Sequence, residues 1–418
     1  MNAEILSVGT ELLMGQIANT NAQYLSKKLS EAGINVYFHT VVGDNPIRLE
    51  KCLNLSISRS DCILMTGGLG PTRDDLTKEI VAKVSGKNLI FSKKIYGKIN
   101  KFFKKMGRPM VESNKRQAFM PEGSIVTENN VGTAPGGIVE FGQKVIVMLP
   151  GPPSELIPMF EKYVLPYFLE RAQSKIVSKF IKVFGLGESD VEQRIMDLID
   201  CQSNPTIAPY AKQGEVTLRV SANAESNQDV NSIINPVVQK IKERLDSHVY
   251  SVEDEELYEV VGKLLIKKNI SISIAESCTG GLISKMITDI PGISKVFKGC
   301  SIVYSNESKI ENLGIKKETI DKHGAVSREV AIEMAESVKR LYNTNIGISS
   351  TGIAGPGGGT ASKPVGLVYI AISDNEKTVT KELRLTGDRK RIRNMASLYS
   401  FDMIRRKLLG LPINNMEE

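Results

Sequence analysis

The chain has 418 residues, of which 41% are hydrophobic and 24% are charged, and it carries a net charge of +7. This length allows two or three domains that fold without disulfides, and the modest basic excess suits a phosphate-bearing small substrate without requiring nucleic acid. No apolar run approaches a membrane span, and the N-terminus enters a predicted strand without a signal-peptide pattern. We therefore expect a cytoplasmic protein.

The cysteines and histidines limit the kinds of metal site that the chain can hold. Five cysteines have no metal-type spacing and form an odd number, which fits a reducing compartment. Three histidines are too few and too scattered for a zinc centre. Any metal should therefore be a hard cation that is held by carboxylates and by substrate phosphates.

Strands and helices alternate in the first region, residues 1–173. The predicted elements are strands at 4–8, 36–42, 62–65 and 145–149 and an amphipathic helix at 21–32. In this helix Leu25 and Leu29 share one face, and Gly33 is the expected C-cap. The alternation predicts an α/β domain with a mostly parallel sheet.

A Gly-rich segment with two adjacent carboxylates, residues 66–79, follows the third of these strands. Its candidate ligand-binding residues are Gly67, Gly68, Gly70 and Arg73. A helix that begins near Asp74 would offer free N–H groups to a phosphate, and Asp74 and Asp75 could hold a Mg²⁺ ion against the same phosphates. The alternative is a structural turn in which an aspartate caps the helix.

Two more Gly/Pro-rich segments, residues 9–15 and 149–155, follow the first and the last of the predicted strands. Glu11 and Glu155 in these loops are weaker candidates to join the metal site. Because loops that converge on one sheet edge form crevices, the three strand ends favour a nucleotide-like pocket.

The middle region, residues 175–252, has a different pattern. Strands are predicted at 179–185 and 215–221, helices at 189–199 and 230–245, and a polar loop at 200–214. These elements make up a small α+β domain. The polar loop and the strand after it also carry residues that could reach a neighbouring active site, namely Tyr210, Lys212 and Arg219.

The third region, residues 255–414, contains a hydroxyl at a strand-to-helix turn. After a predicted helix at 255–268 and a strand at 270–274 come Ala-Glu-Ser-Cys-Thr-Gly-Gly and a helix at 282–290. Such a turn can present the Ser277 hydroxyl together with backbone N–H groups near Cys278 to Gly280 that stabilise an oxyanion. The alternatives are an ordinary polar turn and a Cys278 nucleophile.

Two further strand ends in this region carry polar groups. The segments 304–309 (Tyr-Ser-Asn-Glu-Ser-Lys) and 349–358, which is rich in glycine, each follow a strand-like run. Since His323 is the only histidine nearby, the expected base is Lys309, which would act through Tyr304. In the alternative, these two residues are a strand-end aromatic ring and an exposed charge.

The basic run Arg389-Lys390-Arg391-Ile392-Arg393 is the densest cluster of positive charge in the chain. Arg389 and Arg393 share a helix face, because they are four residues apart. The run is either the solvated start of a helix or a clamp for a substrate phosphate.

Together, the segments 275–281, 304–309 and 349–358 resemble the C-terminal domain of the CinA (competence/damage-inducible) family. Stand-alone members of that family are nicotinamide-nucleotide amidases, which hydrolyse nicotinamide mononucleotide to nicotinic acid mononucleotide and ammonia. The resemblance, over about 255–409, implies Ser277 as the nucleophile, Tyr304 and Lys309 as its activating partners and Thr351 as a substrate-site hydroxyl. The accompanying candidates for substrate binding are Gly280, Gly281, Gly352, Gly355, Arg389 and Arg393.

The segment 66–79 resembles the three-layer molybdopterin-binding fold, and the match covers about residues 1–167. In the full-length CinA family this domain precedes the amidase domain, and its members hydrolyse ADP-ribose to AMP and ribose 5-phosphate. The resemblance implies a divalent metal, Mg, Mn or Co, for this reaction and none for the amidase. It fixes the fold but not the reaction, so a molybdenum-cofactor enzyme that binds a nucleotide or a pterin is an alternative.

The middle region resembles the KH-type domain of the same family. Residues 185–188 read Gly-Leu-Gly-Glu, which is not the Gly-x-x-Gly loop that clamps nucleic acid, and they include an acid. We therefore expect a spacer or a dimerisation role in a homodimer, with no membrane or nucleic-acid partner. The rival hypothesis is a nucleic-acid-binding competence factor.

Overall fold

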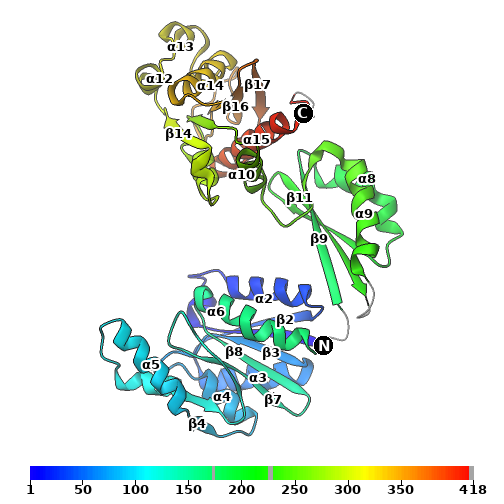
Figure 1. The fold of residues 1–418 in the computed structure, drawn as a ribbon, viewed down its shortest axis with the longest axis vertical. Coiled ribbons are helices and arrows are strands. Elements are labelled where there is room, and N and C mark those ends of the chain that lie inside the picture. Colours follow the sequence, from blue (N-terminus) through cyan, green and yellow to red (C-terminus); the bar gives the residue numbers. More distant parts are fainter. Residues whose placement is uncertain (172–174, 225–228, 414–418) are drawn as a thin grey trace. The chain divides into compact units, whose positions relative to one another are not determined.

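The computed structural model describes residues 1–171, 175–224 and 229–413 (Figure 1). They form two compact units, Met1–Ser178 with Ala222–Val230, and Lys179–Ser221 with Asn231–Glu418. The predicted domain boundaries at 173 and 414 lie outside the described residues. Within the described part of the chain, none of the helices is both long and apolar enough to cross a membrane.

The first unit is built on a six-stranded sheet with the order β2-β1-β3-β8-β7-β6. The strands are β1 (Asn2–Val8), β2 (Asn35–Val42), β3 (Cys62–Thr66), β6 (Ile125–Thr127), β7 (Gly136–Phe141) and β8 (Lys144–Leu149). The pairings from β2 to β8 are parallel, as predicted, whereas β7 and β6 add antiparallel strands at one edge.

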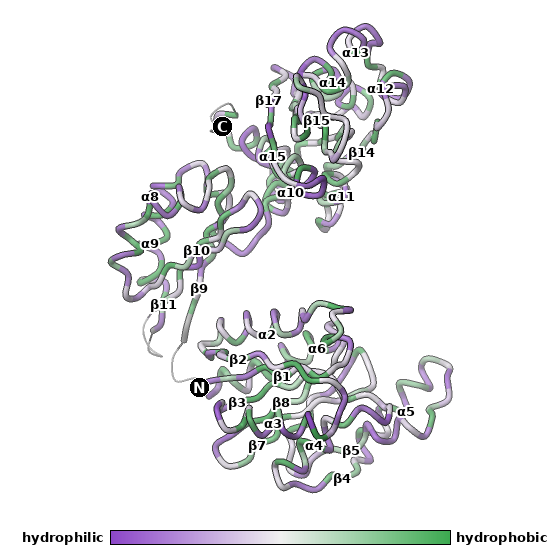
Figure 2. Tube along the Cα trace, turned by 180° about the vertical axis from the view of Figure 1, so that it is seen from behind, coloured by the Kyte–Doolittle hydropathy of each residue, from purple (hydrophilic) through white to green (hydrophobic). Residues whose placement is uncertain are grey.

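Helices cover both faces of this sheet. Alternate residues of β1, such as Ile5 and Leu6, enter two separate apolar cores, and the central strands are hydrophobic along their length (Figure 2). One core contains α2 (Thr20–Glu31), α6 (Pro153–Met159) and α7 (Leu165–Leu169); the other contains α3 (Pro46–Arg59), α4 (Thr77–Val84) and α5 (Lys93–Lys105). The result is a three-layer α/β/α arrangement.

Shorter elements complete the first unit. They are α1 (Thr10–Leu13), the antiparallel pair β4 (Leu89–Phe91) and β5 (Phe119–Pro121), the 3-10 helix η1 (Glu112–Ala118) and the π-helical turn η2 (Phe160–Val164).

The middle region forms a four-stranded sheet with the order β10-β11-β9-β12. Its elements are β9 (Lys175–Phe184), α8 (Glu188–Asp200), β10 (Thr206–Lys212), β11 (Glu215–Ala224), α9 (Val230–Leu245), η3 (Asp246–His248) and β12 (Val249–Ser251). The predicted polar loop 200–214 is wrong, because residues 206–212 of it form strand β10. This edge strand buries only Ile207, so no alternation of apolar residues marked it in the sequence.

The C-terminal region forms a five-stranded sheet with the order β14-β13-β15-β16-β17. The strands are β13 (Ile272–Glu276), β14 (Phe297–Ile302), β15 (Ile346–Gly352), β16 (Leu367–Ser373) and β17 (Thr378–Arg384). Because β14, β13 and β15 are parallel, their C-terminal ends meet at one edge of the sheet. At that edge Glu276 pairs with Ile302 on one side and with Ser350 on the other.

Helices again lie on both faces of the C-terminal sheet. One core contains α10 (Leu257–Lys268), α11 (Leu282–Thr288), η4 (Ile293–Lys295) and the long α15 (Arg389–Leu409). The other contains α12 (Asn306–Leu313), α13 (Lys317–His323) and α14 (Arg328–Tyr342).

The middle region packs directly against the C-terminal region. Phe184 of β9 meets the ring of Tyr399 of α15 edge-on, with 5.0 Å between the ring centroids. In addition, the Arg405 guanidinium donates a hydrogen bond of 2.7 Å to the Ser247 carbonyl. The predicted boundary near residue 252 therefore separates parts of one compact unit.

Candidate active sites

Ser277 is the first residue after β13, because the strand continues two residues beyond the predicted end at Ile274. The Ser277 N–H donates to the Ser350 carbonyl at 3.0 Å, which extends the strand pairing to the nucleophile candidate. Only 7% of Ser277 is exposed. The serine is thus held at the shared edge of β13 and β15.

The buried carboxylate of Glu276 fixes the turn that follows Ser277. It accepts hydrogen bonds from the N–H groups of Gly281 and Ser284, at 2.9 and 2.8 Å, and from the Ser284 hydroxyl. Gly280 and Gly281 have positive φ angles of 59° and 90°, which glycine adopts without strain. Glu276 was not among the predicted site residues, although a carboxylate four residues before a Gly-Gly helix start indicates a possible cap.

Lys309 contacts the Ser277 hydroxyl directly. The distance from Lys309 Nζ to Ser277 Oγ is 3.0 Å, and Nζ also donates to the Val303 carbonyl at 3.0 Å. The lysine is 1% exposed, and this burial lowers its pKa, because the charged form loses its hydration. A neutral amine at this position can accept the serine proton.

The structure does not form the predicted relay from Lys309 through Tyr304. The Tyr304 side chain is 59% exposed, and its hydroxyl accepts a hydrogen bond of 2.7 Å from Arg389. Only its backbone carbonyl approaches Lys309 Nζ, at 3.4 Å. Lysine and serine need no intermediary because the strand ends place them in direct contact.

The two arginines of the basic run have separate positions. Arg389 donates to the Gly355 carbonyl at 2.8 Å and to Tyr304, and it borders the cavity beside Ser277. Arg393 instead binds the Thr279 carbonyl through two nitrogens, at 2.6 and 3.2 Å. Arg389 therefore lies at the wall of this cavity, and Arg393 supports the turn of the serine.

A cavity of about 250 Å³ opens beside Ser277 and Lys309. It is lined by Ser277, Cys278, Tyr304, Asn306, Lys309, Ala325, Val326, Thr351, Gly352, Ile353, Ala354, Gly355, Gly357, Gly358 and Arg389. The expected substrate-site residues Thr351, Gly352 and Gly355 are among them, whereas Gly280 and Gly281 shape the turn behind it. The Thr351 hydroxyl donates to the Ala325 carbonyl at 2.8 Å, so it also anchors the opposite wall.

The turn contains the Cys278 thiol, which is the alternative nucleophile, and the backbone N–H groups that are candidates for an oxyanion site. Burial raises the pKa of the Cys278 thiol to about 12, which keeps it protonated and weakly nucleophilic near neutrality. The Gly280 N–H donates to the Ser277 carbonyl at 3.1 Å, so it is engaged within the turn. The N–H groups of Cys278 and Thr279 are the remaining candidates for an oxyanion site.

In the first unit, the three Gly-rich loops converge on one edge of the sheet, as predicted. The Gly67 N–H donates to the Leu149 carbonyl at 3.0 Å, and Asn21 donates to the Gly151 carbonyl at 2.7 Å. A cavity of about 310 Å³ lies at these strand ends, and it is lined by residues of all three loops, including Glu11, Thr66 and Gly151.

The helix after the Gly-rich loop begins at Thr77, so the predicted start near Asp74 is wrong. The Thr77 hydroxyl donates to the Gly67 carbonyl at 2.8 Å, and its N–H donates to the Gly68 carbonyl at 3.2 Å. These bonds close the loop before the helix starts. Gly67 has no room for a Cβ atom, because the Val8 carbonyl lies 2.2 Å from that position.

The carboxylates of the Arg73-Asp74-Asp75 segment differ in environment. Asp75 accepts hydrogen bonds from the N–H and the hydroxyl of Thr72 and occupies the space that a Cβ on Gly70 would fill. Asp74 is exposed. Arg73 borders a separate cavity of about 350 Å³ with Arg116.

The carboxylate oxygens of Asp74 and Asp75 suit a divalent cation, but they do not make up a complete metal site. Among the described residues, no three or more histidine, cysteine or acidic side chains gather to hold a metal. Asp74 and Asp75 can offer at most two carboxylates, so a substrate would have to supply phosphate oxygens. Glu11 lines the neighbouring cavity, whereas Glu155 is tied to the Asn129 amide at 2.6 Å.

The residues singled out in the middle region lie at the start of helix α8 and on strands β10 and β11. Glu188 is the first residue of α8, directly after Gly187. An acidic side chain therefore stands where the Gly-x-x-Gly loop that clamps nucleic acid has a glycine. Lys212 forms an ion pair of 2.9 Å with Glu256, and Arg219 lies over the Tyr210 ring at 5.6 Å. Tyr210, Lys212 and Arg219 thus take part in contacts within the second unit.

Family models match all three regions of the chain. The description "Probable molybdopterin binding domain" matches residues 4–170, "Damage-inducible protein CinA KH domain" matches 178–251, and "CinA C-terminal domain" matches 254–408. The fold is therefore a molybdopterin-binding-like domain followed by a KH-type and a CinA C-terminal domain.

Relatives match over the whole length. A protein from Acetivibrio thermocellus named as competence-damage inducible is 55% identical over 98% of this chain and 100% of its own. A CinA-like protein from Dictyoglomus thermophilum is 53% identical with the same coverage. A crystal structure of a competence/damage inducible protein from Agrobacterium tumefaciens is 35% identical, covers 37% of this chain and 97% of its own, and has a TM-score of 0.36. The chain belongs to the CinA family.

Proposed function

We propose that the C-terminal domain hydrolyses the carboxamide of nicotinamide mononucleotide, giving nicotinic acid mononucleotide and ammonia. The observation that carries this proposal is the contact of 3.0 Å between the buried Lys309 Nζ and Ser277 Oγ at the edge of a cavity of about 250 Å³. A buried lysine beside a serine hydroxyl is the pairing of base and nucleophile that acyl transfer requires.

The proposed reaction has two halves. Ser277 Oγ attacks the amide carbon, and its proton passes to Lys309 Nζ and then to the departing nitrogen, which leaves as ammonia. Water next attacks the resulting ester, gives a proton to Lys309, and releases the carboxylate, after which Ser277 regains its proton. Arg389, with its guanidinium at the cavity wall, is placed to bind the substrate phosphate.

The test is ammonia release by the full chain after single substitutions. Ser277→Ala and Lys309→Met should each lower the rate by about a hundredfold or more, because both remove a group that acts in the transition state. Cys278→Ser should keep most of the activity, because its thiol is protonated. Full activity in Ser277→Ala, together with loss in the Cys278 variant, would transfer the nucleophile role to the cysteine.

We propose as a second activity that the first domain hydrolyses ADP-ribose to AMP and ribose 5-phosphate with a divalent metal, Mg, Mn or Co. The convergence of three Gly-rich loops on one sheet edge beside a cavity supports this assignment, as do the adjacent carboxylates Asp74 and Asp75 in one of these loops. The metal, when bound, would offset negative charge on the diphosphate. The residues of this chain would orient the substrate and contribute the carboxylates.

The two activities can be separated in one preparation. Asp75→Asn should abolish AMP formation and leave ammonia release unchanged, and EDTA should give the same result. If EDTA stopped both reactions equally, or neither, the two-site proposal would be wrong. Incubation with molybdopterin in place of ADP-ribose tests the molybdenum-cofactor alternative, and titration with labelled DNA at low salt tests the nucleic-acid alternative.

A further inference from the structure

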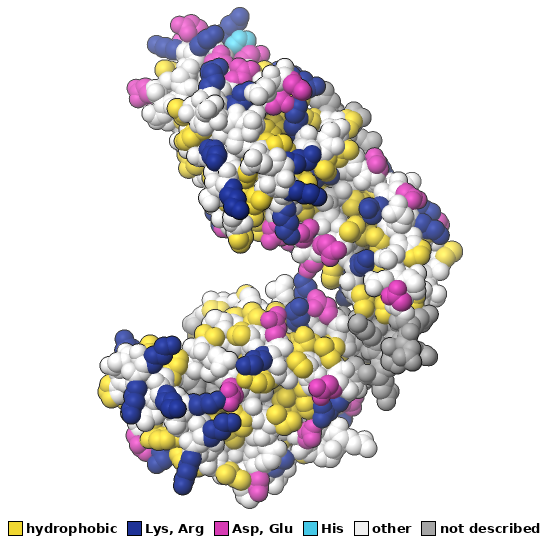
Figure 3. All heavy atoms as spheres, viewed as in Figure 1, with side chains coloured by type: hydrophobic (Ala, Val, Ile, Leu, Met, Phe, Trp, Pro, Cys, Tyr) yellow, Lys and Arg dark blue, Asp and Glu magenta, His cyan; other side chains and the backbone are white. Residues whose placement is uncertain are grey.

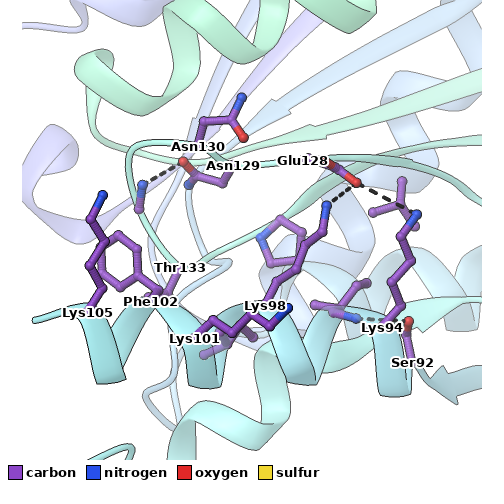
Figure 4. A pocket seen from close by; sticks show the side chains of 15 residues that line it. Ser92, Lys94, Lys98, Lys101, Phe102, Lys105, Glu128, Asn129, Asn130 and Thr133 are labelled. Atoms are coloured by element: carbon purple, nitrogen blue, oxygen red, sulfur yellow. Dashed lines mark hydrogen bonds and ion pairs between the residues drawn. The ribbon is translucent and has the colours of Figure 1, made fainter. Parts of the chain in front are cut away.

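The first unit has a further cavity, of about 440 Å³, between helix α5 and the segment 126–135 (Figure 4). Neither the proposed amidase site nor the Gly-rich loop cavity includes its lining residues. Its volume lies within the range of about 300 to 1,000 Å³ that is typical of small-molecule sites.

Four lysines of α5 border this cavity. Lys94, Lys98, Lys101 and Lys105 are spaced by four, three and four residues, which places them on one face of the helix. In Figure 4 their side chains rise from successive turns of the helix towards the loop that carries Asn129 and Asn130. Basic side chains gather over this end of the first unit in Figure 3 as well.

The positive charge of the cavity is only partly balanced. Glu128, the one acidic residue of the lining, lies 3.8 Å from Lys94 and forms a closer ion pair with Lys98. Lys101 and Lys105 have no carboxylate partner among the described residues. Four like charges on one helix face repel one another, so their spacing is a cost to the isolated helix that a bound anion would remove.

The floor of the cavity is apolar. Ile95 and Ile99 are buried beneath the lysines, Phe102 is half-buried among them, and Pro135 closes the opposite side. Asn129 holds the loop in place, because its amide donates to the Ala134 carbonyl at 3.0 Å. The cavity therefore combines a preformed apolar surface with a rim of uncompensated ammonium groups.

We propose that this cavity binds a nucleoside di- or triphosphate. The phosphates would contact Lys98, Lys101 and Lys105, and the base would lie against Phe102. A simple anion would leave the apolar floor exposed, and an apolar ligand would leave the ammonium groups unpaired. Its lining residues do not belong to the cavity at the Gly-rich loops, although Asn129 donates to Glu155 of the segment 149–155 at 2.6 Å.

The test is binding of ADP to the full chain in the presence of EDTA, measured by calorimetry. Lys101→Gln with Lys105→Gln should weaken binding about tenfold or more, because each lysine supplies a charge-assisted contact. The matched control replaces Lys93 and Lys104 by Gln; both are exposed on α5 but do not line the cavity, and this variant should bind ADP as the wild type does.

Two further probes separate the parts of the ligand. Inorganic pyrophosphate should compete with ADP and lose affinity in the same lysine variant, whereas adenosine should bind weakly and equally to both proteins. Equal loss in the control variant would show general attraction to a basic surface and overturn the proposal. Unchanged binding in the Lys101, Lys105 variant would overturn it as well, provided that its melting temperature matches the wild type.

Discussion

Lys309 shows how burial changes the chemistry of a single residue. In water a lysine is protonated at neutral pH, but here desolvation lowers the pKa of Lys309, and no carboxylate among the described residues forms an ion pair with it. The contacts of its Nζ are the Ser277 hydroxyl and the carbonyls of Val303 and Tyr304. The residue is thus placed to act as a base.

The first prediction is the pH dependence of the proposed amidase. The rate of ammonia release should fall as the pH is lowered through the Lys309 pKa, because the protonated amine cannot accept the serine proton. Lys309→Arg should lose activity about a hundredfold or more at every pH, since a guanidinium stays charged. The measurement is the pH–rate profile, with Lys298→Arg in the neighbouring strand as control. A wild-type profile in Lys309→Arg would exclude the lysine as the base.

Glu276 gives a second prediction at this scale. Glu276→Gln places an amide where four N–H and O–H groups donate, so the buried cap is partly lost. We expect a loss of about 2 to 4 kcal/mol in the free energy of unfolding and a fall in ammonia release. Glu307→Gln, at an exposed position, should lower stability much less. Urea unfolding of both variants measures the difference. Equal free energies of unfolding for Glu276→Gln and Glu307→Gln would contradict the role of Glu276 as a cap.

At the scale of elements, helix α4 carries an unusual buried charge. Lys78 is 5% exposed, donates to the Gln117 carbonyl at 2.8 Å, and has its pKa lowered to about 7 by burial. It ties helix α4 to the 3-10 helix η1.

The third prediction follows from the titration of Lys78. Between about pH 7 and 10.5 an unfolded chain would hold a proton on this lysine that the folded chain does not, so stability should rise with pH. The gain is at most about 1.4 kcal/mol per pH unit. Lys78→Met should remove it, and the exposed Lys83→Met should not. Urea unfolding at pH 7 and pH 9 measures the slope; parallel slopes for wild type and Lys78→Met would refute it.

At the scale of the whole molecule, a buried cluster of charges links the middle and C-terminal regions. Asp402 accepts hydrogen bonds from Arg405 at 2.8 Å and from Arg406 at 2.7 Å, and all three side chains are at most 2% exposed. Arg405 also donates to the Ser247 carbonyl of the middle region. Removing the carboxylate would leave two buried guanidinium groups without their counter-charge.

The fourth prediction is that the second unit unfolds cooperatively. Asp402→Asn should cost about 3 to 5 kcal/mol, because a buried ion pair is broken. Hydrogen exchange should then quicken together in β9, β11, β13 and β15, whereas β1 and β3 of the first unit should keep their protection. Asp289→Asn, which breaks an exposed pair with Lys285, is the control and should cost about 1 kcal/mol or less. Loss of protection in β13 and β15 alone would contradict cooperativity.

Much of this fold could be read from local patterns. Short apolar runs predicted β1, β2, β3 and β8, and an amphipathic period predicted α2, because buried strands and buried helix faces require apolar residues at these positions. The antiparallel strands β6 and β7 and the edge strand β10 carried no comparable pattern. Their pairing depends on neighbours that are distant in the chain.

The candidate amidase site, too, could be predicted only in part from the sequence. The sequence by itself determined its residue types, since Ser277, Lys309 and Thr351 all lie in segments that follow predicted strands, and glycines follow Ser277 and Thr351. Tertiary structure alone decided their contacts. Parallel pairing of β14, β13 and β15 brings Lys309 Nζ into contact with Ser277 Oγ, whereas the Tyr304 hydroxyl is bound by Arg389. Contact and desolvation depend on which strand ends meet in space, and the sequence alone does not show this.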